Sequence, residues 1–457
     1  MSEHRTPEER KAAGKALRKD VTRSSHGDWS PGSDRPDPVD VITSQDTDRV
    51  QWLVPIRHGR MSESAFAFYR GAAKIMAGDL ASTASSGLDA QLCGDAHLAN
   101  FGSYASPDRR QVFDVNDFDE TLPGPWEWDL KRLAASFVLA GRDNSFDEKA
   151  TRSITEQSVA GYRQAMTKFA ADRTLDTWYS QPTLEQIANA TPKKKDRERI
   201  TKQAKKFRSK GSLKALSKLA EHVDGKYQIK SQPPLLLPLR ELTKKMDTDE
   251  LRQQVETSIA SYRNTLADNR RVLFDRFELV DIAMKVVGVG SVGTRCLIVL
   301  FQGRDQDDPL FLQIKEATDA VLEDHLPKST YKEHGERVVR GQRLMQASSD
   351  ILLGWDTNKD ADHHYYWRQF HDMKGSADVE SMNADRLGRY AAICGMTLAH
   401  AHARSADPIA IAGYLGSGDV FDKALAEFGF TYADQNERDY EAFMDAINSG
   451  KIDAAKG

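Results

Sequence analysis

The chain has few cysteines, little net charge and no long apolar run. Its three cysteines, Cys93, Cys296 and Cys394, form neither a CxxC pair nor a disulfide framework, which favours a reducing compartment, the cytoplasm. The net charge of −4 gives no general attraction to nucleic acid or to anionic membranes, so we expect neither as a partner. No apolar stretch approaches the roughly 18 residues of a membrane span. Residues 1–23 also lack the apolar centre of a signal peptide.

A glycine-rich segment is followed by the pattern of a β-hairpin and a lysine. Gly288, Gly290 and Gly293 have the spacing G-x-G-x-x-G, with Ser291 between them, and Lys315 closes the second apolar strand that follows. In a dinucleotide-binding fold this spacing opens a helix. In protein-kinase-like enzymes it joins two strands above the ATP phosphates, and a lysine on the next strand reaches the α- and β-phosphates. The β-branched residues after the loop favour the kinase-like alternative, while a plain hairpin with a surface lysine stays open.

The lysine of such a site usually pairs with a carboxylate from the next helix. Glu336 and Glu333 lie at suitable positions in the sequence, and Glu316 and Glu323 are weaker candidates. We choose Glu336 as the predicted partner of Lys315.

Acidic residues in the first third of the chain have the spacing of a phosphotransferase active site. Asp95 and Asn100 are five apart, as in the D-x-x-x-x-N of a kinase catalytic loop, and Asp117 follows from the next predicted hairpin in Asp117-Phe118-Asp119. Asp95 would orient the attacking hydroxyl and accept its proton. Asn100 and Asp117 would hold Mg²⁺, with Asp119 as a possible further ligand. His97 has no Cys/His cluster around it in the sequence, so we expect a structural role rather than a zinc site.

These motifs occur in the reverse of the usual order. The G-D-x-H-x-x-N and D-F-D segments resemble the aminoglycoside and choline phosphotransferases, and the helical pattern over 387–402 resembles the helix that leads into their catalytic loop. The sequence therefore predicts an α+β, circularly permuted protein-kinase-like fold. It would have a small β-rich nucleotide lobe and a large, mainly helical lobe.

The predicted organisation has five parts. Residues 1–45 are rich in Ser, Asp, Arg and Pro and are expected to form a disordered arm. The other four parts are a catalytic and metal-binding part (46–144), a helical insert that could build the acceptor site (145–275), the nucleotide lobe (276–376) and the helical remainder (377–457).

Beyond the arm, almost the whole chain also resembles an uncharacterised bacterial family, domain of unknown function 2252. The segments that carry this resemblance are 66–71 (FAFYRG), 93–102 (CGDAHLANFG), 116–136 (NDFDETLPGPWEWDLKRLAAS), 285–295 (KVVGVGSVGTR) and 373–379 (MKGSADV). The family implies no activity, so the motifs carry the functional expectation.

Together the motifs predict a Mg²⁺- and ATP-dependent phosphotransferase. A small-molecule hydroxyl is the expected acceptor, because no activation segment of the protein-kinase type follows Asp117. Two alternatives use the same site, namely a nucleotide-binding regulatory protein (a pseudokinase) and a nucleotidyl transferase. An NAD-dependent oxidoreductase is the alternative from a different class.

Overall fold

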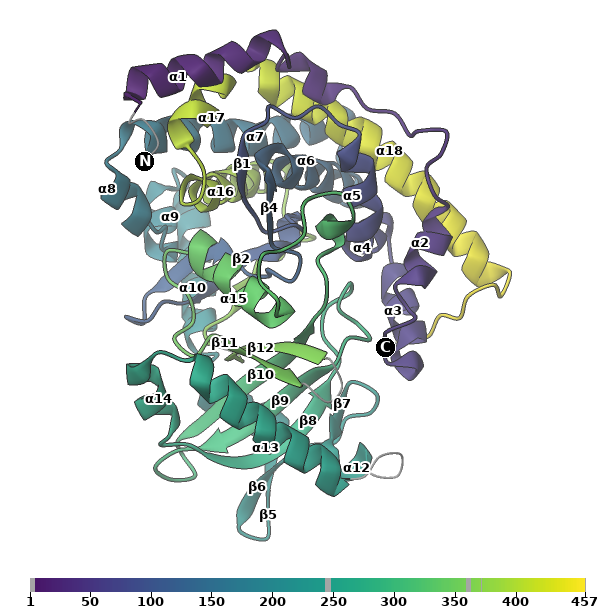
Figure 1. The fold of residues 1–457 in the computed structure, drawn as a ribbon, viewed down its shortest axis with the longest axis vertical. Helices are drawn as coiled ribbons and strands as arrows, with labels where there is room; N and C mark the ends of the chain where they lie inside the picture. Colours follow the sequence, from purple (N-terminus) through teal and green to yellow (C-terminus); the bar gives the residue numbers. More distant parts are fainter. Residues whose placement is uncertain (1–4, 243–247, 359–362, 371, 457) are drawn as a thin grey trace.

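The computed structural model describes residues 5–242, 248–358, 363–370 and 372–456 of a mixed α+β protein. A β-rich part occupies the lower half of Figure 1, and helices fill the upper half. None of the helices in the described ranges is long and apolar enough to cross a bilayer.

The β-rich part is built on one antiparallel sheet of six strands in the order β11-β12-β10-β9-β8-β7. The strands are β7 (Leu236–Pro238), β8 (Glu278–Lys285), β9 (Cys296–Gln302), β10 (Pro309–Ala317), β11 (Gly354–Asn358) and β12 (His363–Gln369). The hairpin predicted after the glycine segment is confirmed as β9–β10, in which Lys315 lies opposite Cys296. Lys315 also faces Tyr366 of β12, so Lys315 lies on an interior strand.

Helices cover both faces of this sheet. On one face α13 (Thr248–Thr265) and α14 (Asp268–Phe274) pack through Tyr262, whose ring stacks on Trp367 at 4.4 Å between centroids. On the other face α11 (Ser212–Leu219) packs with β5 (Ala220–Val223) and β6 (Lys226–Ile229). The predicted helical insert over 145–275 is therefore corrected: its second half contains strands and belongs to the sheet.

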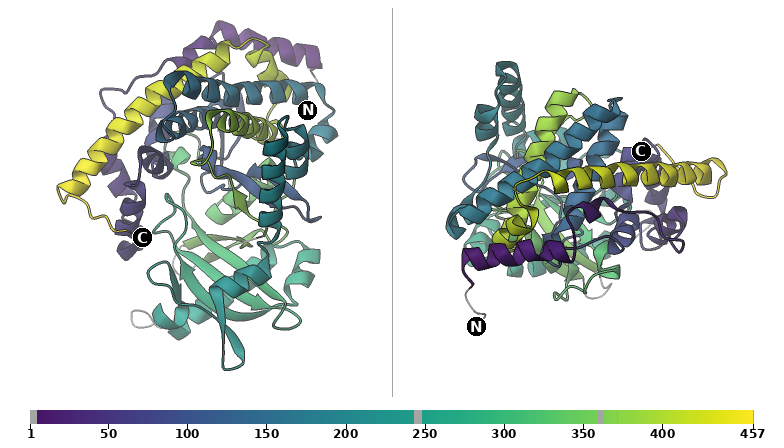
Figure 2. Two further views of the ribbon diagram at one scale, coloured as in Figure 1. Left: turned by 180° about the vertical axis from the view of Figure 1, so that it is seen from behind. Right: turned by 90° about the horizontal axis from the view of Figure 1, so that it is seen from above.

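The helical part is centred on α6 (Trp126–Asp143), which is buried from Trp126 to Gly141. This burial on all sides is why its sequence is apolar around much of its circumference. The long helices α7 (Glu148–Ala171), α16 (Ala384–Ala403) and α18 (Val420–Asn448) pack against it (Figure 2), and the short helix α17 (Pro408–Leu415) packs on α7. The helices predicted over 126–141 and 385–404 are confirmed.

The N-terminal residues differ from the predicted disordered arm of 1–45. Helix α1 (Pro7–Ala16) begins at Thr6 with a capping box to Glu9, and α2 (Pro38–Ser44) follows after an irregular stretch. Arg10 pairs with Asp407 at 2.7 Å, which ties α1 to α17 on the outer side of the helical part. This segment has a polar composition, but it is ordered because it packs on the surface of α17 and α18.

The remaining elements are short strands and helices. The small strands are β1 (Asp89–Leu92), β2 (Phe101–Ala105), β3 (Gln111–Val115), β4 (Leu122–Pro125) and β13 (Gly375–Ser376). The remaining helices are α3 (Val54–Met61), α4 (Ala65–Gly71), α5 (Ala73–Ala81), α8 (Thr174–Tyr179), α9 (Leu184–Ala190), α10 (Lys194–Arg208), α12 (Leu239–Leu242) and α15 (His334–Met345). Strand β2 pairs with both β3 and β13, which brings the chain around residue 375 beside the Asp95 segment.

Candidate functional site

A cleft of about 770 Å³ lies between the β-rich part and the helical part. Residues from both predicted halves of the active site line it. They are Asp95, Asn100, Asp117, Asp119, Gly288, Gly290 and Ser291. Lys315 reaches the same place, because its amine contacts Asp117 and Asp119. Of the predicted site residues, Lys315, Glu336 and Gly293 are not among those that line the cleft, and Lys315 reaches it only through these two contacts.

Asn100 is fixed by its amide nitrogen and leaves its oxygen free. It sits in a short turn between β1 and β2, and its Nδ2 donates to the backbone oxygens of Asp95 at 3.1 Å and Asp117 at 3.0 Å. Its Oδ1 is buried without a hydrogen-bond partner among the described residues. Buried polar atoms are rarely left unpaired, so an oxygen held in this way is suited to bind a group that the chain itself does not supply.

Asp95 is held from behind by a buried arginine. Arg132 of α6 donates to its carboxylate at 2.7 Å, and Asp129, one helical turn earlier, accepts the backbone N–H groups of Cys93 and Gly94 at 2.8 and 3.0 Å. His97 lies 3.6 Å from Asp95; burial, which outweighs the charge of Asp95, lowers the pKa of His97 to about 4. Its ring is therefore neutral at pH 7, as the structural role predicted for it requires.

Lys315 pairs with the two aspartates of the D-F-D segment. Its amine lies 3.3 Å from Asp117 and forms a close ion pair with Asp119, which also accepts the hydroxyl of Tyr366 at 2.7 Å. Burial raises the pKa of Asp119, and the charge of Asp117 adds to this effect. Burial works the same way on Asp117, but the charges of Lys315 and Arg368 outweigh it and hold the pKa of Asp117 well below its usual range. Asp117 is thus a charged carboxylate that is about 40% exposed to the cleft.

The predicted pairing of Lys315 with Glu336 is wrong. Glu336 pairs with Arg340 one turn along the same helix, at 3.1 Å. The next residue, Arg337, faces inward instead and donates to the backbone oxygens of Asp119 and Thr121 at 2.8 and 2.7 Å. Helix α15 therefore contacts the D-F-D segment through Arg337, and Asp119 is the carboxylate partner of Lys315.

Three carbonyl oxygens of the glycine loop accept hydrogen bonds from the helical part. Arg60 donates to the oxygen of Gly288 at 2.6 Å, and Arg49 donates to that of Val292, also at 2.6 Å. The amide of Val50 donates to the oxygen of Gly293 at 2.8 Å. Loops rich in glycine can bind anions through their backbone N–H groups. Position 290 favours glycine, because a Cβ there would lie 3.0 Å from the backbone oxygen of Arg70.

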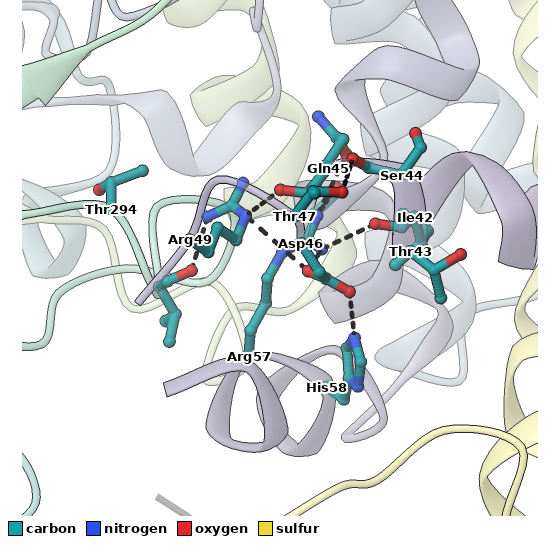
Figure 3. A network of polar contacts seen from close by, with 12 residues as sticks. Ile42, Thr43, Ser44, Gln45, Asp46, Thr47, Arg49, Arg57, His58 and Thr294 are labelled. Atoms are coloured by element: carbon teal, nitrogen blue, oxygen red, sulfur yellow. Dashed lines mark hydrogen bonds and ion pairs between the residues drawn. The ribbon is translucent and has the colours of Figure 1, made fainter. Parts of the chain in front are cut away.

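Figure 3 shows the polar network around Arg49. Asp46 accepts hydrogen bonds from Arg57 at 2.7 Å and from the ring of His58 at 2.9 Å, and its carboxylate lies 3.9 Å from Arg49. The Arg57 side chain is fully buried. Because a buried charge is stable only when it is paired and hydrogen-bonded, Asp46 fixes the segment from which Arg49 reaches the glycine loop.

Sequence reasoning did not find Asp46 or Arg337 in these roles. Arg337 carries no local signal, because its partner Asp119 lies 218 residues earlier in the chain. The partners of Asp46, Arg57 and His58, lie 11 and 12 residues later, beyond the range of a helix or turn pattern. A cluster of Asp319, Glu323 and His334 brings possible ligand atoms within 4.8 Å of one another, but nothing else at that place points to a metal.

Comparison with known proteins gives the chain a family. A family described as uncharacterised and conserved in bacteria (DUF2252) matches residues 49–446. The chain belongs to the DUF2252 family. No curated protein and no solved structure matches it. The resemblance found in the sequence is thereby confirmed, and the matched range includes every predicted site residue of this DUF2252 protein.

Proposed function

We propose that this DUF2252 protein is a Mg²⁺- and nucleoside-triphosphate-dependent phosphotransferase, with the parts of a protein-kinase-like fold in circularly permuted order. ATP is the donor that the sequence predicts. One observation carries the proposal: a single cleft gathers the glycine loop, Lys315, Asp117, Asn100 and Asp95, although the two halves are almost 200 residues apart in the chain. An accidental match of two unrelated motifs gives no reason for them to meet.

The permuted order is supported by the packing of α16. The hydroxyl of Tyr390 on this helix donates to the backbone oxygen of Leu98 at 2.9 Å and lies 3.3 Å from that of Phe101. The helix that resembles the one leading into a phosphotransferase catalytic loop thus lies directly against that loop. A permuted order is tolerated when the joined ends lie close in space.

The residues present fit a magnesium ion. Mg²⁺ prefers oxygen ligands and commonly takes one or two protein groups together with phosphate oxygens and water. Asn100 offers an unpartnered buried oxygen, and Asp117 offers a charged carboxylate that is open to the cleft. Asp119 was predicted as a further ligand, but Lys315 and Tyr366 already occupy its two oxygens. A bound Mg²⁺ would neutralise charge on the phosphates.

The chain's own groups would divide the remaining tasks among them. The glycine-loop N–H groups and Lys315 would bind the phosphates, and this binding would release Asp117 from the lysine. Asp95 would accept the proton of the acceptor hydroxyl, and Arg132 would keep its carboxylate oriented. The cleft is open beside Asp95, and the chain passes from Asp119 through β4 directly into α6, which supports a small-molecule acceptor.

Nucleotide binding followed by thermal shift tests the proposal. Mg·ATP is expected to raise the Tm of the wild type, ATP alone is expected to raise it less, and Asp117→Asn is expected to weaken the effect of Mg²⁺. Asp108→Asn is a matched control, since Asp108 is exposed and pairs only with nearby Ser106 and Arg110. A shift with NADH and none with any nucleoside triphosphate would contradict the proposal and favour the oxidoreductase.

Asp95→Ala separates an enzyme from a regulatory protein. In a phosphotransferase this change is expected to abolish slow nucleotide consumption while nucleotide binding persists. A wild-type protein that binds nucleotide and never consumes it would favour the regulatory alternative. Release of inorganic pyrophosphate, in place of phosphate, would favour nucleotidyl transfer.

A further inference from the structure

The chain crosses between the β-rich part and the helical part at one end of the cleft, just after β12. Its backbone groups there are already engaged. The N–H of Phe370 donates to Phe311 O at 2.9 Å, and that of Met373 donates to Lys210 O at 3.0 Å. The oxygen of Asp372 accepts from Ala105 N at 3.1 Å. Residue 371 lies outside the described residues. These three peptide groups are therefore not available to bind a nucleotide base.

Two cationic side chains face the cleft at this end. Arg368 is held by Gln313, which accepts its Nε–H at 3.0 Å, and by the backbone oxygen of Asn116, which accepts from Nη1 at 3.1 Å. These bonds leave Nη2 for another partner. Lys374 lines the same cleft and makes no hydrogen bond or ion pair with any described residue. Within the described part of the chain, neither cation pairs with a carboxylate.

Burying Arg368 and Lys374 without an opposite charge lowers the stability of the free protein unless a ligand binds to them. Taking a cation out of water is unfavourable, and other cations of the site are paired, such as Lys315 with Asp119 and Arg132 with Asp95. Burial, together with the charge of Arg368, lowers the pKa of Lys374 to about 7. These two side chains present hydrogen-bond donors to the cleft, next to the ring of Phe370, which also lines it.

We propose that Arg368 and Lys374 recognise the base of the nucleotide and select an oxo-purine, guanine or hypoxanthine, over adenine. This inference rests on the proposed function. Guanine presents two acceptors, O6 and N7, on the edge where adenine presents an N6 amino donor beside N7, and arginine and lysine match the guanine pattern. Adenine would place its amino group against these two donors and leave them unpaired. The nucleotide that supplies the phosphate group is therefore GTP or a related triphosphate, in place of the ATP that the motifs predict.

Calorimetric binding of four ligands in the presence of Mg²⁺ tests this assignment. The ligands are GTP, ITP, ATP and inorganic triphosphate. For the wild type we expect GTP and ITP to bind about tenfold or more tightly than ATP. Lys374→Met and Arg368→Gln are each expected to remove most of that preference while ATP affinity changes little. Lys374→Met is the safer variant for folding, because Lys374 makes no internal bond. Lys74→Ala is the control: it also lines the cleft but pairs with Asp324 at 3.1 Å, so the preference is expected to persist.

The outcomes separate this inference from the proposed function. ATP binding as tightly as GTP would overturn the assignment of the base and leave the phosphotransferase proposal standing. Equal affinities for inorganic triphosphate and GTP, lost together in Lys374→Met, would overturn it as well, since the two cations would then bind phosphate. If no triphosphate binds with Mg²⁺, both proposals fail.

Discussion

The side chain of Asn100 donates to the carbonyl oxygen of Asp117 at 3.0 Å, which ties the two predicted metal ligands to each other. The same amide nitrogen donates to Asp95 O, so the orientation of the side chain is fixed and Oδ1 is the group left over. The backbone of the metal segment thus determines where the Asn100 oxygen points.

Asn100→Ala is expected to abolish the effect of Mg²⁺ on nucleotide binding and to lower the free energy of unfolding by about 1–2 kcal/mol, because two hydrogen bonds are lost. Calorimetry with and without Mg²⁺ and urea unfolding measure these effects. Asn144→Ala, which removes a comparable bond to Val379 O, is the control and is expected to leave nucleotide binding unchanged. An undiminished Mg²⁺ effect in Asn100→Ala would contradict the metal assignment.

Lys315→Ala is expected to weaken nucleotide binding by roughly 1.5–3 kcal/mol, about 10- to 150-fold, since a buried charge-assisted contact to phosphate is lost. Titration of the Mg²⁺ nucleotide complex measures it. Lys74→Ala again serves as the comparison, because its ion pair is partly exposed. Equal affinities in all three proteins would remove Lys315 from the site.

Asp46→Ala is expected to destabilise the fold by about 3–5 kcal/mol, because it leaves the fully buried Arg57 without its carboxylate partner. Asp48→Ala, two residues away and exposed, is expected to change stability by less than about 0.5 kcal/mol. Urea unfolding at pH 7 compares them. If the two variants lose the same amount, the network in Figure 3 does not fix this segment.

The advantage of the wild type over Asp46→Ala also depends on pH. Burial opposes ionisation of Asp46, but the hydrogen bond from His58 and the charge of Arg57 outweigh it and lower the pKa of Asp46. A carboxyl group with a lowered folded-state pKa contributes stability above its ordinary pKa, about 4. That contribution is lost as the pH falls further, through the folded-state pKa. The difference between the two proteins is therefore expected to be full at pH 6 and to shrink below about pH 4.

Gly293→Ala is expected to weaken nucleotide binding more than Gly225→Ala. Both glycines have a positive φ, +93° and +81°, so each substitution carries a similar backbone strain of about 1–2 kcal/mol. A Cβ at position 225 meets open space, whereas one at 293 lies 3.0 Å from Arg49 Cβ and pushes on the residue that holds the loop. Thermal unfolding measures the effect of backbone strain on stability, and nucleotide titration measures the effect of displacing the loop on affinity. Unchanged affinity in Gly293→Ala would show that the loop position does not matter.

Lys374→Met is expected to stabilise the free protein at pH 7. Burial and Arg368 lower the pKa of Lys374 to about 7 in the folded protein, with Asp350, Asp117 and Lys315 as the other charges near it. The unfolded chain, with an ordinary lysine pKa near 10.4, binds more protons between these values. Wild-type stability therefore rises with pH from about 7 to about 10, and the gain from Lys374→Met shrinks over this range. Tm values at pH 7, 8.5 and 10 measure it, and a pH-independent difference would contradict it.

Features with a local cause were predictable from the sequence. Strands β9 and β10 follow from two apolar β-branched runs around a turn, and α6 follows from its helical periodicity after Pro123-Gly124-Pro125. The spacing of Asp95 and Asn100 reflects one tight turn, so both residues line one cleft in the structure.

Features set by distant partners were not predictable. The choice of Glu336 failed because neighbouring helix residues point about 100° apart, and sequence spacing does not show that Arg337 faces the metal segment. The arm over 1–45 looked unable to build a core, but its partners lie about 400 residues later, where Arg10 meets Asp407. Asp46 has an ordinary loop sequence around it, and only the folded chain brings Arg57 and His58 onto its carboxylate.

The contact between Tyr390 and the loop at Leu98 spans 292 residues and has a consequence for biosynthesis. At a synthesis rate of roughly 5–20 residues per second, α16 emerges about 15–60 s after the loop that it packs against. Until then, the Asp95 segment lacks the helix beneath it, and α6 lacks a neighbour for its apolar surface. The candidate site is therefore incomplete for most of the synthesis of the chain and is completed only near the end of translation.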